Sequence, residues 1–221
     1  MSTLRGIIFD IDGTLIDSVD AHTHAWVTTF AEFGYDIPYA RVRSLIGMGG
    51  DTLLPEAIGK QKDSPEGEKI SKQRDALFAE KYLAGVQPFP KAHELLVRVH
   101  SAGLKVIFAT SGDSKQSDVL LKKLDAEKLT EAKTTSGDAE KSKPEPDIIL
   151  AALRKANLSP TEVIMVGDTP YDIVAAGKAN VRTVAVRCGG WKDGDLKGAA
   201  AIYDDPSDLL VHFETLLTLP G

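Results

Sequence analysis

Five short apolar runs, each bounded by turn residues, recur along the chain. They are nearly continuous rather than alternating with polar residues, which is typical of strands buried on both faces of a parallel sheet. The runs cover residues 6–9, 105–109, 163–166, 181–186 and 200–203. Helical patterns lie between the later runs. This alternation predicts βαβ units, and therefore an α/β fold with a doubly wound, Rossmann-like parallel sheet.

The clearest helical pattern follows residue 147. Ile148, Ile149, Ala152, Leu153 and Ala156 repeat at helical spacing, and two basic residues occupy the last turn. One face of this helix is therefore expected to pack on the sheet.

Residues 16–86 contain no such strand run and carry several helical segments separated by glycine-bearing turns. We expect an all-helical cap domain here, inserted into a core formed by residues 1–15 and 87–221. Its first helix is predicted to begin after an N-cap at Ser18 and to end at Gly34. Its last helix is predicted to start at Ser64 and to end near Gly85.

The composition limits the classes of function. The 221 residues include 32 acidic and 26 basic ones, for a formal net charge of −6, without blocks of one sign. A basic footprint for nucleic acid is therefore not expected. The single cysteine, Cys188, cannot form an internal disulfide. Neither a secretory signal nor a membrane span is expected, which predicts a cytoplasmic monomer or homodimer.

Two acidic residues, Asp10 and Asp12, directly follow the first apolar run. Ligands bind beyond the carboxyl ends of strands in doubly wound sheets, so these side chains stand where a site is expected. Two carboxylates two residues apart on a strand point to the same face, and their repulsion is relieved by a cation or a proton. Hard oxygen ligands favour Mg²⁺.

Four segments in order resemble the signatures of the haloacid-dehalogenase superfamily. They are residues 10–15 (DIDGTL), 108–112 (FATSG), 142–148 (SKPEPDI) and 166–173 (VGDTPYDI). Any one of them alone is weak evidence, but each lies at the edge of a predicted strand or helix. The helical insertion resembles the cap of the branch that contains phosphoglycolate phosphatases and β-phosphoglucomutases.

The resemblance implies a Mg²⁺-dependent phosphatase with an aspartyl-phosphate intermediate. Asp10 is the expected nucleophile, which divides one hydrolysis into two easier displacements. Asp12 is the expected general acid and base, and it contributes its backbone carbonyl to the metal. Asp168 is expected to share Mg²⁺ with Asp10. Asp172 lies one helical turn after Asp168, where it either contacts the metal or orients groups around it.

The same resemblance gives the phosphoryl group its positive and neutral partners. Lys143 is expected to supply a fixed positive charge beside the nucleophile, and Thr110 a hydroxyl donor. Ser111 and Gly112 precede a helix, so their backbone amides are expected to bind the phosphoryl group of the substrate. A surface lysine at a helix start is the alternative for Lys143, although a cation is unfavourable there.

Within the insertion, the glycine-rich loop at residues 46–51 matches the position of the branch's specificity loop. Gly47 and Gly49 are predicted to let the backbone approach a substrate, and a flexible turn between helices is an equal alternative. His22 resembles a cap histidine of the β-phosphoglucomutases that engages the site; a packed cap histidine is the alternative. The four basic cap residues are expected mainly at the solvated surface, namely Arg41, Arg43, Lys60 and Lys62.

The expected substrate is a small phosphorylated metabolite, because a cap closes over the site and limits what enters. A mutase is the first alternative, but Gly49 or Gly50 stands where the mutases carry a phosphate-binding arginine. A phosphonatase would use a cap lysine, for which Lys60 and Lys62 are candidates. A dehalogenase usually lacks the acid at Asp12, and a non-catalytic binding protein would have little reason to keep all five polar groups.

Overall fold

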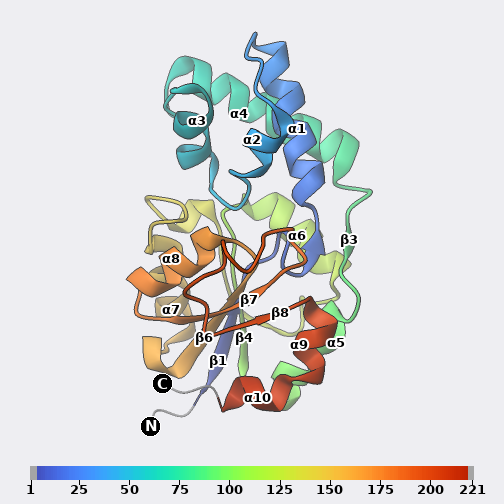
Figure 1. The fold of residues 1–221 in the computed structure, drawn as a ribbon, viewed down its shortest axis with the longest axis vertical. Coiled ribbons are helices and arrows are strands. Elements are labelled where there is room, and N and C mark those ends of the chain that lie inside the picture. Colours follow the sequence, from blue (N-terminus) through green and yellow to red (C-terminus); the bar gives the residue numbers. More distant parts are fainter. Residues whose placement is uncertain (1–3, 219–221) are drawn as a thin grey trace.

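A six-stranded parallel sheet forms the centre of the computed structural model, which describes residues 4–218 (Figure 1). The strand order is β5-β4-β1-β6-β7-β8. The doubly wound α/β fold is therefore confirmed. The strands are β1 Gly6–Phe9, β4 Lys105–Ala109, β5 Thr130–Thr134, β6 Val163–Gly167, β7 Arg182–Val186 and β8 Ala201–Tyr203.

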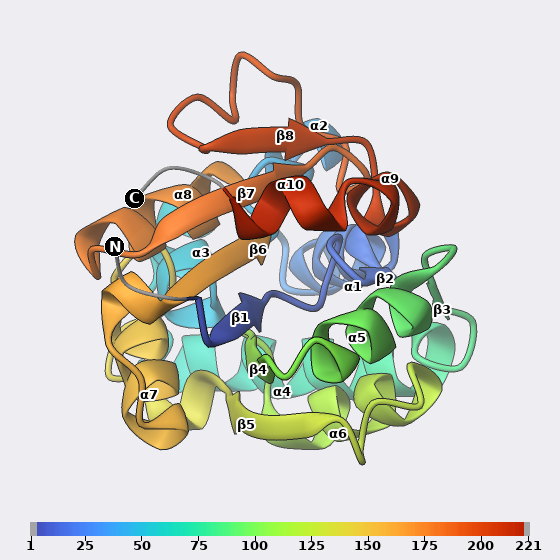
Figure 2. The ribbon, with the colours of Figure 1, turned by 90° about the horizontal axis from the view of Figure 1, so that it is seen from below.

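Helices cover both faces of the sheet (Figure 2). Successive residues of a strand point to opposite faces, so Ile7 and Phe9 pack in one apolar cluster and Ile8 in the other. The first cluster includes residues of α5 Ala92–Ser101, α6 Ser114–Lys123, α9 Pro206–Val211 and α10 Phe213–Leu217. The second includes residues of α7 Asp147–Ala156 and α8 Pro170–Lys178.

A helical segment rises above the carboxyl end of the sheet between two short strands (Figure 1). Strands β2 Ile16–Asp17 and β3 Gln87–Pro88 pair antiparallel, so the chain leaves and re-enters the core at adjacent points. The helices between them are α1 Val19–Glu32, α2 Tyr39–Arg43, α3 Gly50–Ile58 and α4 Pro65–Leu77, followed by a π-helical turn at Phe78–Tyr82. We propose that this segment, residues 16–86, is the cap.

The cap segment has its own apolar cluster, in which Trp26 and Phe30 of α1 pack with Leu53 and Leu54 of α3. One side of α1 is therefore buried in this cluster. Ser64 caps α4 by accepting a hydrogen bond from the Gly67 amide, as the sequence predicted. Ser18 precedes α1, but its side chain makes no capping bond. The Ser18 hydroxyl instead donates a hydrogen bond to Asp12.

One strand of the six-stranded sheet, β5, was not predicted from the sequence. Its residues are mostly polar, and only Ala132 and Thr134 are buried. It lies at the edge of the sheet, where a single neighbouring strand, β4, supplies its hydrogen bonds. An edge strand does not need the continuous apolar run of a central one.

No helix among residues 4–218 is both long and apolar enough to cross a membrane.

Replacement of Phe30 by alanine tests how tightly the apolar cluster of the cap segment is packed. Phe30 is fully buried there, so Phe30→Ala is expected to reduce the free energy of unfolding by about 3–5 kcal/mol. Chemical denaturation measures the loss. Val211 is 80% exposed, and Val211→Ala is the control, with a change within about 0.5 kcal/mol. Equal effects of the two substitutions would contradict the packing described.

Candidate active site

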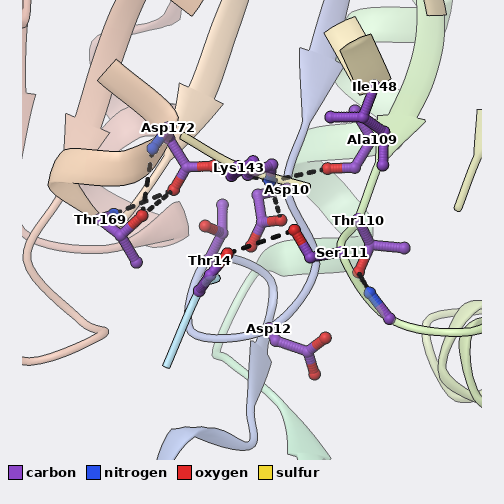
Figure 3. Close-up of polar contacts among 12 residues, drawn as sticks. Asp10, Asp12, Thr14, Ala109, Thr110, Ser111, Lys143, Ile148, Thr169 and Asp172 are labelled. Atoms are coloured by element: carbon purple, nitrogen blue, oxygen red, sulfur yellow. Dashed lines mark hydrogen bonds and ion pairs between the residues drawn. The ribbon is translucent and has the colours of Figure 1, made fainter. Parts of the chain in front are cut away.

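The four sequence signatures meet at the carboxyl end of the sheet (Figure 3). Asp10 follows β1, Thr110 follows β4 and Asp168 follows β6, and these strands are neighbours in the parallel sheet. Parallel neighbours end at the same edge, so side chains from distant parts of the sequence lie together. All three side chains are buried.

Lys143 is the positive centre of this site. Its Nζ lies 2.5 Å from Asp10 Oδ1 and 2.7 Å from Asp172 Oδ1, and it donates to the carbonyl oxygen of Ala109 at 2.9 Å (Figure 3). Only 1% of the residue is exposed, so the surface alternative for Lys143 is wrong. Burial acts to lower the pKa of Lys143, but the two carboxylates reverse this and raise it above its ordinary value. The ammonium group is thus fixed in its charged form.

The acidic side of the site exceeds this single positive charge. Asp10, Asp168 and Asp172 each offer a carboxylate oxygen within 4.8 Å of the others, and all three residues are buried. Burial raises the pKa of Asp10 to about 7, against the lowering effect of Lys143. Burial and the charges of Asp172 and Asp10 raise the pKa of Asp168 well above its ordinary value. Three buried carboxylates around one lysine therefore lack a second positive charge.

The surroundings of Asp168 fit a divalent cation. Its Oδ1 accepts a hydrogen bond from Thr14 at 2.9 Å, whereas its buried Oδ2 has no partner among the described residues. A Cβ at Gly13 or Gly189 would lie 2.5 Å or 1.7 Å from that oxygen, so both glycines are needed for the backbone to come this close. An unpartnered hard oxygen beside Asp10 is what Mg²⁺ requires of its ligands.

Asp172 is held in place by its own helix end. Its Oδ2 accepts from the backbone amide and the hydroxyl of Thr169, while Thr169 Oγ1 caps the Asp172 amide, so the two form a capping box at the start of α8. Its other oxygen faces Lys143. Asp172 thus orients the lysine and also stands within reach of a metal ion. The sequence reasoning missed Thr169, although a Thr-x-x-Asp pattern is a recognisable capping signature.

Asp12 lies apart from the buried acids and contacts the cap segment instead. Ser18 Oγ donates to Asp12 Oδ1 at 2.6 Å, and His22 Nε2 lies 2.9 Å from the same oxygen. Burial opposes ionisation, but the hydrogen bonds from His22 and Ser18 prevail and lower the pKa of Asp12 to about 2. Asp12 is therefore ionised in this arrangement. His22 lies beside the site through its contact with Asp12, and its role in binding a substrate stays a prediction.

Arg74, on α4, completes this chain of contacts and was not singled out in the sequence. Its Nη2 lies 2.5 Å from His22 Nδ1. A guanidinium only donates, so the His22 ring must accept at Nδ1 and carry its proton on Nε2. Burial accordingly lowers the pKa of His22. The guanidinium carbon lies 5.1 Å from the Trp26 ring centre and 5.2 Å from that of Phe78, a cation–π arrangement.

A cavity of about 70 Å³ lies between these groups and the sheet. Residues of both the cap segment and the core enclose it. Its lining is Asp10, Asp12, His22, Trp26, Ile46, Gly47, Met48, Gly49, Gly50, Arg74, Thr110, Ser111, Gly112 and Gln116. Nearly all residues named from the sequence as substrate contacts therefore border one space.

Two details of this lining differ from a simple ring of phosphate donors. The Gly112 amide donates to Thr110 Oγ1 at 3.0 Å, so these two predicted phosphate contacts bind each other in this structure. Ser111 Oγ donates to the Gly47 carbonyl at 3.3 Å, which links the core to the cap loop. Binding of a phosphoryl group at these positions stays a prediction.

The basic cap residues named from the sequence do not border the cavity. Arg41 donates to the Glu56 carbonyl, and Arg43 pairs with Asp20. Lys60 pairs with Glu66, and Lys62 borders a separate groove. Within residues 4–218, the cavity lining thus contains neither of the lysines considered for a phosphonatase.

Comparison with known proteins decides the family. The family model described as haloacid dehalogenase-like hydrolase matches residues 7–186, which is most of the chain. The chain belongs to the haloacid dehalogenase-like hydrolases. The resemblance inferred from the four signatures is confirmed.

Relatives of this hydrolase align over nearly its whole length. It is 27% identical over 213 residues to the N-acetylmuramic acid 6-phosphate phosphatase of Pseudomonas aeruginosa, covering 94% of this chain and 93% of the relative. It is 29% identical over 233 residues to the phosphoglycolate phosphatase of Escherichia coli, covering 94% and 91%. The crystal structure of a hydrolase from Pseudomonas syringae is 31% identical and superimposes with a TM-score of 0.89, covering 96% and 99%.

Replacement of Asp168 by asparagine tests the metal site without a substrate. Wild-type protein is expected to gain thermal stability on addition of Mg²⁺, because binding to the folded state alone stabilises it. Asp168→Asn is expected to lose this gain. It should also be more stable than wild type in EDTA, since it removes a buried, uncompensated carboxylate. Melting temperatures measured with and without Mg²⁺ check both effects.

Asp36→Asn is the matched control, because Asp36 is exposed on the cap segment and its removal changes the net charge equally. It should keep the full response to Mg²⁺. A Mg²⁺ response in Asp168→Asn equal to that of wild type would rule out Asp168 as a ligand.

Proposed function

We propose that this protein is a Mg²⁺-dependent phosphatase that hydrolyses a small-molecule phosphate monoester through a phosphoryl group carried on Asp10. The observation that carries the proposal is the buried pair of Asp10 and Lys143, with 2.5 Å between Oδ1 and Nζ, at the strand end that borders the cavity. Lys143 holds one oxygen of the nucleophile and leaves the other for attack on phosphorus. Relatives named as phosphatases support the same reaction.

In the first step, an Asp10 oxygen attacks phosphorus and the bond from phosphorus to the leaving oxygen breaks. Asp12, which is ionised before the substrate binds, takes up the proton of a monoanionic phosphate monoester and passes it to that leaving oxygen. In the second step, Asp12 takes a proton from the water that attacks the aspartyl-phosphate. Ser18 and His22 both donate to Asp12, so they favour the ionised carboxylate that the second step needs. Lys143 stays protonated throughout and stabilises the negative charge on the transferring oxygens.

Asp10 and Asp168, with the backbone carbonyl of Asp12, are the proposed ligands of Mg²⁺. Bound there, the ion supplies the positive charge that the three buried carboxylates lack and offsets the charge of the incoming phosphate. Asp172 is proposed to act mainly on Lys143, whose Nζ it contacts.

We further propose that the leaving group carries a carboxylate that binds Arg74. The Arg74 side chain is nearly buried and borders the cavity. Its Nη1 donates to Asp75 and its Nη2 to His22, whereas its Nε has no partner among the described residues. The substrates in the names of two relatives, phosphoglycolate and N-acetylmuramic acid 6-phosphate, are both carboxylates. A fixed guanidinium suits such a group because it donates two parallel hydrogen bonds.

A phosphosugar mutase remains the alternative, but no contact in the cavity favours it. The β-phosphoglucomutase of Clostridium difficile shares the fold, with a TM-score of 0.82 at 22% identity over 97% of each chain. Gly49 and Gly50 leave the loop position of the mutases' arginine without a side chain. A cytoplasmic location is proposed on the composition alone.

Substitution of the two strand acids separates their roles. Asp10→Asn is expected to abolish turnover, because no phosphoryl group can form on residue 10. Asp12→Asn is expected to lower turnover of alkyl phosphates by about 10²–10⁴-fold, the usual contribution of a positioned acid and base. With p-nitrophenyl phosphate, whose leaving group needs little protonation, phosphate should accumulate on Asp10 and be found by mass spectrometry after rapid quenching. Label on another residue would show that the nucleophile is misassigned.

Substitution of Arg74 tests the substrate class. Arg74→Met keeps an apolar stem against Trp26 and Phe78 but removes the charge. The kcat/KM for 2-phosphoglycolate is expected to fall by about tenfold to 100-fold more than that for p-nitrophenyl phosphate, because only the former has a carboxylate. Arg41→Met, at an exposed cap position, is the control. It should leave kcat/KM unchanged for both substrates. Equal losses on both substrates would count against carboxylate recognition.

A further inference from the structure

We propose that Asp51, on the cap segment, is a positioning residue for Lys143: it binds the backbone amide of Ser142 and thereby couples cap closure to the placement of the lysine. The inference rests on the proposed function, in which Lys143 holds the nucleophile. It identifies the contact by which the closed cap acts on the chemistry of the core.

The contact joins the two parts of the molecule across 91 residues of sequence. Asp51 lies in the first turn of α3, and its Oδ2 accepts from the Ser142 N–H at 2.9 Å. Ser142 is buried, and the next residue is Lys143. A hydrogen bond from an amide to a carboxylate is about twice as strong as one between neutral groups. Asp51 therefore binds the backbone amide of the residue directly before Lys143.

The segment that carries Lys143 needs such a support. Between the 3₁₀ turn Ser136–Asp138 and the start of α7 at Asp147, the chain forms neither helix nor strand. Its backbone position is therefore not fixed by a ladder of hydrogen bonds. The Lys143 side chain must nevertheless reach Asp10 and Asp172 together, which a shift of about 1 Å would prevent.

The loop around Asp51 is built for this close approach. A Cβ at Gly49 would lie 2.4 Å from Ser142 Cβ and 2.0 Å from its Oγ, so only glycine allows the cap loop to lie against Ser142. The requirement for glycine at position 49 thus follows from contact between cap and core, whether or not a substrate also touches it.

This hydrogen bond can break without a large penalty when the cap opens. Asp51 and Ser142 border a polar groove of about 470 Å³, lined also by Lys62, Asp63 and Glu140. Water in this groove can hydrate the carboxylate and the amide once they separate. The bond therefore forms only in the closed state, and with it the firm placement of Lys143.

Kinetics of four variants with p-nitrophenyl phosphate test the proposal. Asp51→Ala is expected to lower kcat by about tenfold to 100-fold with KM changed less than twofold, because the lost interaction acts on the transition state. Asp51→Asn keeps an acceptor oxygen and should restore most of kcat. Asp63→Ala removes an exposed charge from the same groove and should match wild type.

The fourth variant separates positioning from simple cap closure. Tyr171 donates from its hydroxyl to the Ser44 carbonyl at 2.5 Å, a second contact between core and cap that does not involve the Ser142 segment. Tyr171→Phe is expected to keep kcat within twofold. An equal loss of kcat in Tyr171→Phe and Asp51→Ala would overturn the proposal, since Asp51 would then only hold the cap shut.

Amide hydrogen exchange provides a readout that does not depend on activity. In Asp51→Ala, the peptide containing Ser142 and Lys143 should exchange at least tenfold faster than in wild type, whereas the peptide containing Thr110 should not change. Unchanged exchange at Ser142 would refute the coupling even if kcat fell. If wild type hydrolysed no phosphate ester, the proposed function would fail, yet the exchange result would still decide whether Asp51 holds this segment.

Discussion

The structure of the site depends on one imbalance of buried charge. Asp10, Asp168 and Asp172 are buried together, and Lys143 is the cation that contacts two of them. Removal of these groups from water is costly, and one ammonium cannot compensate three carboxylates. Burial, together with the remaining negative charge, raises the pKa of Asp10 and Asp168. These three carboxylates could hold a metal ion.

The surrounding structure maintains this arrangement. The parallel sheet brings the ends of β1, β4 and β6 together, and the capping box at Thr169 fixes Asp172. Glycines at positions 13 and 189 let the backbone approach Asp168 where any side chain would collide. The core thus holds like charges close together at a cost in local strain, as functional sites often do.

The cap segment contributes a second set of contacts, which acts on Asp12 rather than on the buried acids. His22 and Arg74 form a chain of hydrogen bonds that ends on the Asp12 carboxylate. The same segment reaches the Lys143 loop through Asp51. The small cavity is therefore lined by groups from both parts of the chain.

The sequence by itself determined the central strands, the helical insertion and the residues that meet at the end of the sheet, because near-continuous apolar runs and strand-terminal acids are local signals. It did not reveal β5, whose polar residues need only one neighbouring strand, nor the role of Ser18, whose side chain donates to Asp12 instead of capping its helix. Arg74 was not singled out, and Asp51 was included in the loop at residues 46–51 without a role of its own, since charged residues on helices usually face solvent. Only the tertiary structure decided these, because their partners lie on other elements, brought within hydrogen-bonding distance by the closed cap.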